Sequence, residues 1–176
     1  MGTELLSQRE GAEPETQFAF AMMPPADIDH WWDRSICAAV EEVKRRTKPA
    51  WPVARVYHWL ATNVARAGLT FFGDELVAVT IVCSDGDALA GPRDGLVLLT
   101  WSDPKNRARG IDEEVRRFTQ QEVDTHARAA GFRRLKMFSP RIGMLGRPDR
   151  PGRKGKPGFA IRLGWRLGGL MFVKDL

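Results

Sequence analysis

Residues 106–115, Asn-Arg-Ala-Arg-Gly-Ile-Asp-Glu-Glu-Val, carry a pattern that could bind a phosphate group. They follow an apolar run, 96–101, that predicts a buried strand, and they lead into a predicted helix. A turn at this place can hold an anion, because the free amides and the dipole of a helix N-terminus attract negative charge. The segment contains Arg107-x-x-Gly110, but three acids follow it at 112–114.

Three interpretations of this turn stay open. It is a plain helix start, in which Gly110 permits a tight turn and the acids are favourable first-turn residues; it is a cofactor loop; or it binds another ligand. The acids would repel a pyrophosphate at ~4–6 Å by on the order of 1–4 kcal/mol. For a cofactor loop, the binding residues would be Arg107, Ala108, Arg109, Gly110 and Ile111.

The elements that must position the turn alternate between strand and helix patterns. Apolar runs predict strands at 17–23, 69–72, 76–83, 95–101, 134–139 and 169–174. Apolar steps of three and four predict helices at 27–47, 52–68, 111–130 and 159–166. Val64 is expected on the buried face of the second helix, and Gly68 and Gly131 are expected to end the second and third. The order β-α-α-β-β-β-α-β-α-β predicts an α/β fold with a three-layer mixed β-sheet and helices on both faces.

Composition predicts one domain, 17–176, preceded by an acidic N-terminal arm, 1–16. The 176 residues carry a net charge of +5. Residues 1–20 hold four Glu and one Arg, whereas 141–176 hold nine Lys or Arg and two Asp. Cys37 and Cys83 are expected to be buried free thiols. No apolar run is long enough to span a membrane, and no secretory signal is recognisable.

A Pro/Gly-rich basic loop, 140–158, is predicted to lack regular structure. It is a solvated loop, a docking surface for another protein chain, a clamp for a cofactor phosphate, or a contact to nucleic-acid phosphates. Trp31 is a further candidate for partner contact, because exposed tryptophans are enriched at interfaces. No metal site is predicted, since His58 and His126 lack ligands at a suitable spacing. The candidate partner-binding residues of the loop are Arg147, Arg150, Arg153, Lys154 and Lys156.

The element order resembles the GNAT (Gcn5-related N-acetyltransferase) fold over residues 17–176. Arg107-x-x-Gly110 is similar to the start of the family's acyl-CoA loop, Arg/Gln-x-x-Gly-x-Gly/Ala. Residues 129–132, Ala-Ala-Gly-Phe, and 163–165, Leu-Gly-Trp, resemble family motifs before later strands. Two departures concern function. Asp112 stands where the family has Gly or Ala, and Ala160 stands where many members place a catalytic Tyr; the only tyrosine here is Tyr57.

The leading functional hypothesis is a virion-associated or assembly protein of a tailed bacteriophage, built on a GNAT scaffold with a degenerate acyl-CoA loop. The chain resembles such proteins in His30-Trp-Trp, in 138–141, Phe-Ser-Pro-Arg, and in its Lys-Asp-Leu end. This role implies neighbouring virion or assembly chains as partners, no cofactor, and a place in the host cytoplasm and then the virion. The alternative is an active N-acetyltransferase that uses acetyl-CoA, with an unknown catalytic residue. A second alternative is a nucleic-acid-associated protein.

Overall fold

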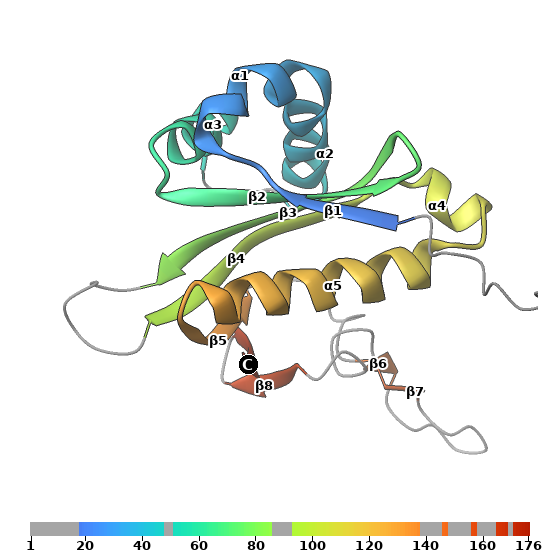
Figure 1. Ribbon diagram of the computed structural model, residues 1–176. Helices are drawn as coiled ribbons and strands as arrows, with labels where there is room; N and C mark the ends of the chain where they lie inside the picture. Colours follow the sequence, from blue (N-terminus) through green and yellow to red (C-terminus); the bar gives the residue numbers. More distant parts are fainter. Residues whose placement is uncertain are drawn as a thin grey trace, which may run out of the picture.

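The computed structural model describes residues 18–47, 51–85, 93–137, 146–147, 156–157, 165–168 and 171–176. A seven-stranded sheet has the order β1-β2-β3-β4-β5-β9-β8 (Figure 1). All neighbouring strands in it are antiparallel except β4 and β5, which are parallel. Its strands are β1 (Phe18–Met22), β2 (Ala65–Phe72), β3 (Glu75–Asp85), β4 (Arg93–Ser102), β5 (Phe132–Met137), β8 (Arg166–Gly168) and β9 (Met171–Asp175).

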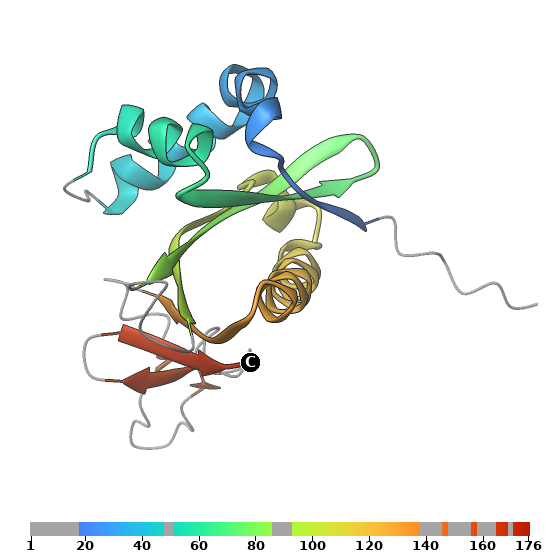
Figure 2. The same cartoon turned by 60° about the vertical axis from the view of Figure 1, so that its left-hand side comes forward.

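Helices cover both faces of this sheet (Figures 1 and 2). On one face a nearly continuous helical run is followed by α3 (Val53–Ala61), and on the other lies α5 (Asp112–Ala129). The predicted three-layer α/β fold with a mixed sheet is therefore confirmed. The helical run consists of the 3-10 turn η1 (Pro25–Asp27), α1 (Ile28–Trp31), the π-helical segment η2 (Trp32–Ile36) and α2 (Cys37–Thr47).

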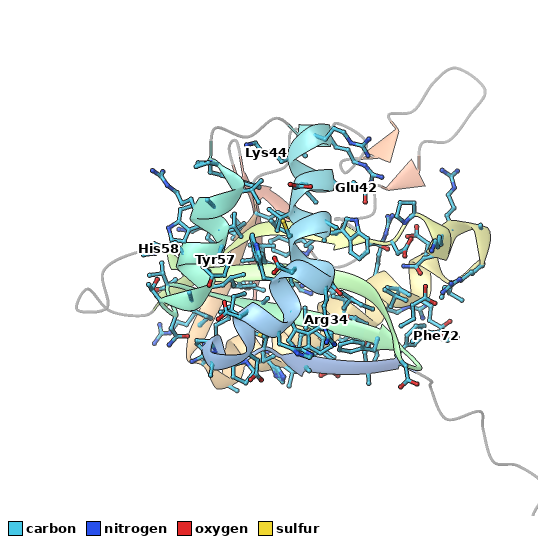
Figure 3. All side chains as sticks on the ribbon, turned by 90° about the horizontal axis from the view of Figure 1, so that it is seen from above. Arg34, Glu42, Lys44, Tyr57, His58 and Phe72 are labelled. Carbon is cyan, nitrogen blue, oxygen red and sulfur yellow. The ribbon has the colours of Figure 1, made fainter. Side chains whose placement is uncertain are left out.

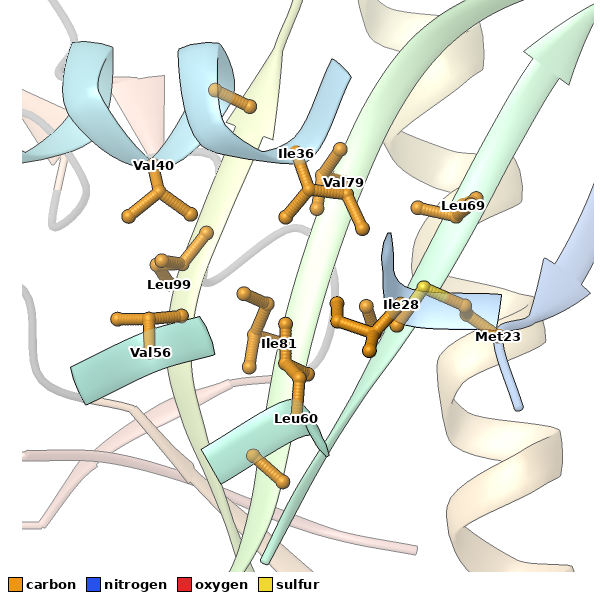
Figure 4. Packing of buried hydrophobic residues seen from close by; sticks show 13 residues of the cluster. Met23, Ile28, Ile36, Val40, Val56, Leu60, Leu69, Val79, Ile81 and Leu99 are labelled. Atoms are coloured by element: carbon orange, nitrogen blue, oxygen red, sulfur yellow. The ribbon is translucent and has the colours of Figure 1, made fainter. Parts of the chain in front are cut away.

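The main core lies between the sheet and α1–α3. Ile36 and Val40 of the helical run meet Val79 and Ile81 of β3, and all four side chains are fully buried (Figure 4). Val56 and Leu60 of α3 close the same cluster. The steps of three and four in the helices and the apolar run in β3 were the signals that predicted this packing. Among the described helices, none is long and apolar enough to cross a membrane.

The predicted end of the second helix at Gly68 is wrong. The helix α3 ends at Ala61, seven residues earlier than expected, and Asn63 has a positive φ of 59°, which turns the chain into β2. Val64 is therefore 56% exposed instead of buried. Gly68 lies inside β2, where an added Cβ would stand 2.4 Å from the Phe20 ring. Its lack of a side chain admits a neighbouring aromatic ring and does not cap a helix.

The C-terminal predictions are partly corrected. Part of the basic loop does form regular structure, because β6 (Gly146–Arg147) and β7 (Lys156–Pro157) make a short antiparallel ladder. This ladder tolerates Pro157, because both strands of a two-stranded sheet are edge strands and the missing N–H of proline can face outward. The predicted helix 159–166 ends in a strand residue, Arg166 of β8, and its positions 159–164 lie outside the described residues. The same holds for the arm 1–16.

Gly95 lets β4 and β5 pair closely. It is the register partner of Leu135, which is fully buried, and an added Cβ would lie 2.7 Å from the Leu135 Cδ2 atom. We expect Gly95→Ala to lower the free energy of unfolding by about 1–3 kcal/mol, the usual cost of overpacking a core. Chemical denaturation measures this loss. In a Leu135→Ala background the same change should cost clearly less, and an equal cost in both backgrounds would contradict the steric explanation.

Candidate functional site

The parallel strands β4 and β5 pair over only half of β4. Their register runs from Arg93 to Val97 on β4 and ends at Met137 on β5. At this point β4 carries a bulge, because Val97 pairs with Val82 and Leu99 with Ile81, which leaves Leu98 as the extra residue. Bulges bend a strand and increase its twist. Within the described residues, where β5 ends at Met137, no strand pairs with 98–102 on the β5 side; these residues form the second half of β4.

The backbone groups on the β5 side of the second half of β4 can be identified from the ladder between β3 and β4. The Asp103 amide donates to the Val77 carbonyl at 2.9 Å, so these two residues are a hydrogen-bonded pair. Such pairs alternate along antiparallel strands, so the N–H and C=O of Thr100 and Ser102 point away from β3, to the β5 side of β4. The Thr100 side chain is exposed. An extended ligand that carries amides could therefore pair with this edge as a strand does.

A second bulge fixes the turn that follows β4. Val77 is the extra residue of β3 against β2, and its carbonyl accepts from the Asp103 amide and, at 2.9 Å, from the Asn106 side-chain amide. Asn106 is fully buried in the short helix α4 (Lys105–Ala108) and also donates to the Ser102 hydroxyl at 3.1 Å. Asn106 Oδ1 has no partner among the described residues. The turn is thus held to β3 by buried hydrogen bonds.

The structure places the five predicted cofactor-binding residues in this turn, but most of their amides are already used. Arg107 and Ala108 lie in α4, and Gly110 has the positive φ of 74° that its glycine predicts. The amides of Arg109, Gly110 and Ile111 each donate to a carbonyl of the same turn, at 3.0 to 3.2 Å. The first helical bond of α5 runs from Val115 to Ile111. The first turn of α5 therefore begins directly after the five predicted residues, and the amides of Asp112 and Glu114 have no acceptor within the helix.

Charge around the turn is unevenly used. Arg109 pairs with Glu75 of β3 at 2.8 Å, which lowers the pKa of Glu75 mainly through this hydrogen bond and raises the pKa of Arg109. The pair is therefore complete at neutral pH and is lost only as the pH falls through the lowered pKa of Glu75. Lys105 and Arg107 are exposed on α4. The cations that remain directed to solvent are thus on the α4 side of the turn.

Asp112, the residue that departs from the family pattern, turns toward β4. Its carboxylate accepts from the Ser102 hydroxyl at 3.2 Å and pairs with Arg116 of the next helical turn at 2.9 Å. The side chain is 27% exposed. Its charge is partly balanced by Arg116, which reduces the repulsion toward a pyrophosphate that the sequence alone predicts.

Other predicted residues lie away from this site or outside the described part of the chain. Trp31 is half-buried and packs against the core and the Phe71 ring, 5.6 Å between centroids. Arg147 and Lys156 lie in β6 and β7, and Arg150, Arg153 and Lys154 lie outside the described residues. Their role in partner contact stays a prediction. Both cysteines are half-buried and form no disulfide, and the described residues include no group of metal ligands.

Sequence reasoning missed two features of the site. Thr100 gave no signal, because one threonine in an apolar run is unremarkable. The second is the Glu42 carboxylate of α2, which accepts from the Trp101 indole N–H at 2.5 Å and also pairs with Arg46 (Figure 3). This contact places an acid against the second half of β4, on the side of the sheet that α1–α3 cover.

Known structures share this architecture. No protein-family model and no curated protein sequence matches the chain. A GNAT family acetyltransferase from Brucella melitensis in complex with acetyl-CoA is similar with a TM-score of 0.59 at 12% identity, covering 92% of this chain and 90% of that one. A putative GNAT acetyltransferase from Desulfovibrio desulfuricans gives 0.56 at 12% identity, covering 90% and 98%. An aminoglycoside acetyltransferase from an uncultured soil metagenomic sample, in complex with sisomicin, gives 0.54 at 10%, covering 74% and 82%. The chain therefore has the fold of the GNAT acetyltransferases.

Proposed function

We propose that this protein is an acyl-CoA-dependent N-acyltransferase, most simply an acetyltransferase. The observation that carries the proposal is the second half of β4, where the backbone groups of Thr100 and Ser102 point away from β3, beside the turn at the start of α5. One ligand can occupy both places if it has an extended amide-containing arm and a pyrophosphate. The GNAT fold, shared with a neighbour in complex with acetyl-CoA, supports the same assignment.

The residues present fit acetyl-CoA. Thr100 and Ser102 offer backbone donors and acceptors to the two amides of the pantetheine arm. The first-turn amides of Asp112 and Glu114 in α5 offer donors to the pyrophosphate, and the helix dipole favours its charge. Lys105 and Arg107 are exposed beside this turn and add positive charge. Asp112 opposes binding, but its pairing with Arg116 weakens that effect.

When bound, acetyl-CoA supplies the activated acyl group as a thioester. The chain then has to orient it and admit an amine. The acyl group would pass to the amine nitrogen: a carbon–nitrogen bond would replace the carbon–sulfur bond, and the proton lost by the nitrogen would end on the CoA sulfur. Tyr57 is not placed for this step, because its hydroxyl lies on α3 and donates to Asp29 at 2.5 Å. The position Ala160 lies outside the described residues. Direct attack by the amine needs neither group.

The proposal is tested by the release of free CoA thiol from acetyl-CoA in the presence of amines. A panel of a polyamine, an aminoglycoside and a peptide with a free N-terminus covers small and extended acceptors. We expect release that requires both the protein and one of the amines, with an acetylated amine as the second product. Thiol release at the uncatalysed rate with every acceptor, although acetyl-CoA binds, would reject acyl transfer and leave a binding role.

Asp112 tunes this binding. We expect Asp112→Asn to tighten acetyl-CoA binding about three- to tenfold, because one negative charge is removed beside the pyrophosphate while most of the shape is kept. The gain should shrink at high salt. Calorimetric titration measures it, with Glu122→Gln, the same charge change further along α5, as the matched control. Equal affinities for Asp112→Asn and the wild type would mean that Asp112 does not face the pyrophosphate.

The bacteriophage assembly role stays a prediction. It depends on the arm 1–16 and on the basic loop 140–158, and most of these residues lie outside the described part of the chain. An acyltransferase fold and an assembly role are compatible, since a scaffold can keep its shape while its partners differ. Nucleic-acid contact through the same loop has the same standing. If purified bacteriophage particles do not contain this chain, the virion role is rejected.

A further inference from the structure

A pocket of about 540 Å³ lies on the helical layer, between α1, η2 and α3. Its six lining residues combine two carboxylates, two aromatic rings and two small apolar side chains: Asp29, Trp32, Asp33, Val53, Ala54 and Tyr57. None of them belongs to the turn 103–114 or to β4. The pocket is therefore a feature separate from the acyl-CoA site proposed above.

The two rings form one corner of the pocket. Trp32 and Tyr57 contact each other with centroids 5.2 Å apart and planes at 71°, and Figure 3 shows Tyr57 on the side of α3 that faces the first helices. In this edge-to-face arrangement one ring presents its face beside the edge of the other. Both side chains are half-buried, so they offer an apolar wall that water does not fully cover. Aromatic faces attract cations through the ring quadrupole.

The two carboxylates give the pocket its sign. Asp29 and Asp33 are four positions apart on one helical run, where like charges repel. The Tyr57 hydroxyl occupies one oxygen of Asp29 at 2.5 Å, and this hydrogen bond, followed by desolvation and both carboxylates, raises the pKa of Tyr57. The hydroxyl thus stays protonated and keeps Asp29 oriented. The two carboxylates make the pocket locally negative, although the net charge of the whole chain is +5.

The backbone under the pocket is also unusual. Trp32 and Asp33 begin the π-helical segment η2. π-segments are rare, their turn is wider than that of an α-helix, and they frequently occur at functional sites. Here the wider turn brings Trp32 and Asp33 to the same pocket as Asp29.

We propose that this pocket binds a small organic ammonium ion, with Asp29 and Asp33 balancing its charge and Trp32 and Tyr57 packing against its alkyl groups. An inorganic cation would gain little from the rings, and a neutral ligand would leave the two carboxylates in mutual repulsion. The site goes beyond the proposed acyl transfer and does not depend on it. It gives the helical layer a binding function of its own, such as sensing or retaining a cationic metabolite.

Choline and its neutral isostere, 3,3-dimethylbutan-1-ol, are the matched probes. The indole N–H signals of the six tryptophans are followed by NMR during titration, with Trp32 assigned from Trp32→Phe. We expect saturable shifts at Trp32 with choline, at a dissociation constant on the order of 1 mM, and binding at least about tenfold weaker for the isostere. Asp33→Asn should weaken choline binding about tenfold, and Asp27→Asn, the same change at a nearby acid outside the pocket, less than about twofold.

Asp33→Asn and Asp27→Asn replace exposed side chains, and Trp32→Phe keeps an aromatic ring at a half-buried position, so circular dichroism should report an unchanged fold. Tyr57→Phe keeps the ring and removes the hydroxyl, and it should retain most of the binding. Equal shifts with choline and the isostere, or equal losses in Asp33→Asn and Asp27→Asn, would overturn the proposal. So would shifts confined to tryptophans outside the pocket. Loss of acyl transfer with intact choline binding would leave this proposal standing.

Discussion

Asp124→Ala should lower the free energy of unfolding by about 3 kcal/mol or more, the usual cost of breaking a buried ion pair by removing one partner. Asp124 lies on α5 with a side chain 8% exposed, and its carboxylate pairs with Lys174 of β9, itself 16% exposed. The other carboxylate oxygen accepts from Gln120 at 2.7 Å, and Gln120 in turn accepts from the Trp165 indole at 3.2 Å. This network attaches the C-terminal strands to α5.

Chemical denaturation measures the loss, and a double variant identifies its origin. Asp124→Leu combined with Lys174→Met replaces both charges by apolar groups of similar size, so it should be much less destabilising than Asp124→Ala alone. A loss below about 1 kcal/mol for Asp124→Ala would show that the pair is solvated, like an ordinary surface ion pair. A double variant as unstable as the single one would place the cost in packing and not in the unpaired ammonium.

Thr100→Pro should weaken acetyl-CoA binding by at least about tenfold, which corresponds to one lost hydrogen bond and a steric block at the β4 edge. Proline removes the Thr100 N–H, which points to the β5 side of β4 and not into the ladder with β3. The strand should therefore survive, because proline is tolerated where the missing N–H has no ladder partner. Calorimetric titration measures the affinity, and denaturation checks the fold.

Thr100→Val is the matched control, since it keeps the backbone N–H and removes only the hydroxyl. It should bind acetyl-CoA within about threefold of the wild type, because the proposed contact uses the backbone. If Thr100→Val loses as much affinity as Thr100→Pro, the side chain makes the contact. If a folded Thr100→Pro binds normally, the ligand does not pair with this edge of β4.

The fold was largely predictable because its elements are locally consistent. The helix starting near residue 111 and the positive φ at Gly131 followed from the turn acids and from glycine after a helical run. Val64 and Gly68 were misassigned because both fit a longer helix by spacing. The early turn at Asn63 and the approach of Phe20 from β1 depend on tertiary contacts, which no local pattern contains.

The candidate site was predictable only in part. The turn 106–111 could be recognised from Arg107 and Gly110, and the partner of Asp112 could have been found from the spacing of four to Arg116. The two bulges, at Val77 and Leu98, could not, because the buried strands are continuously apolar and an inserted residue leaves no change in pattern. Without the bulges, the direction of the Thr100 backbone groups, and so the role of Thr100, cannot be derived.

Calorimetric titration of acetyl-CoA into the wild-type protein tests the central claim most directly. The account predicts saturable binding at one site per chain with a dissociation constant on the order of 1–100 μM. The affinity should fall with added salt, because a pyrophosphate meets a helix N-terminus. The absence of saturable heat up to about 1 mM acetyl-CoA would contradict it. The turn before α5 would then be a helix start alone, and the chain a GNAT fold without its cofactor.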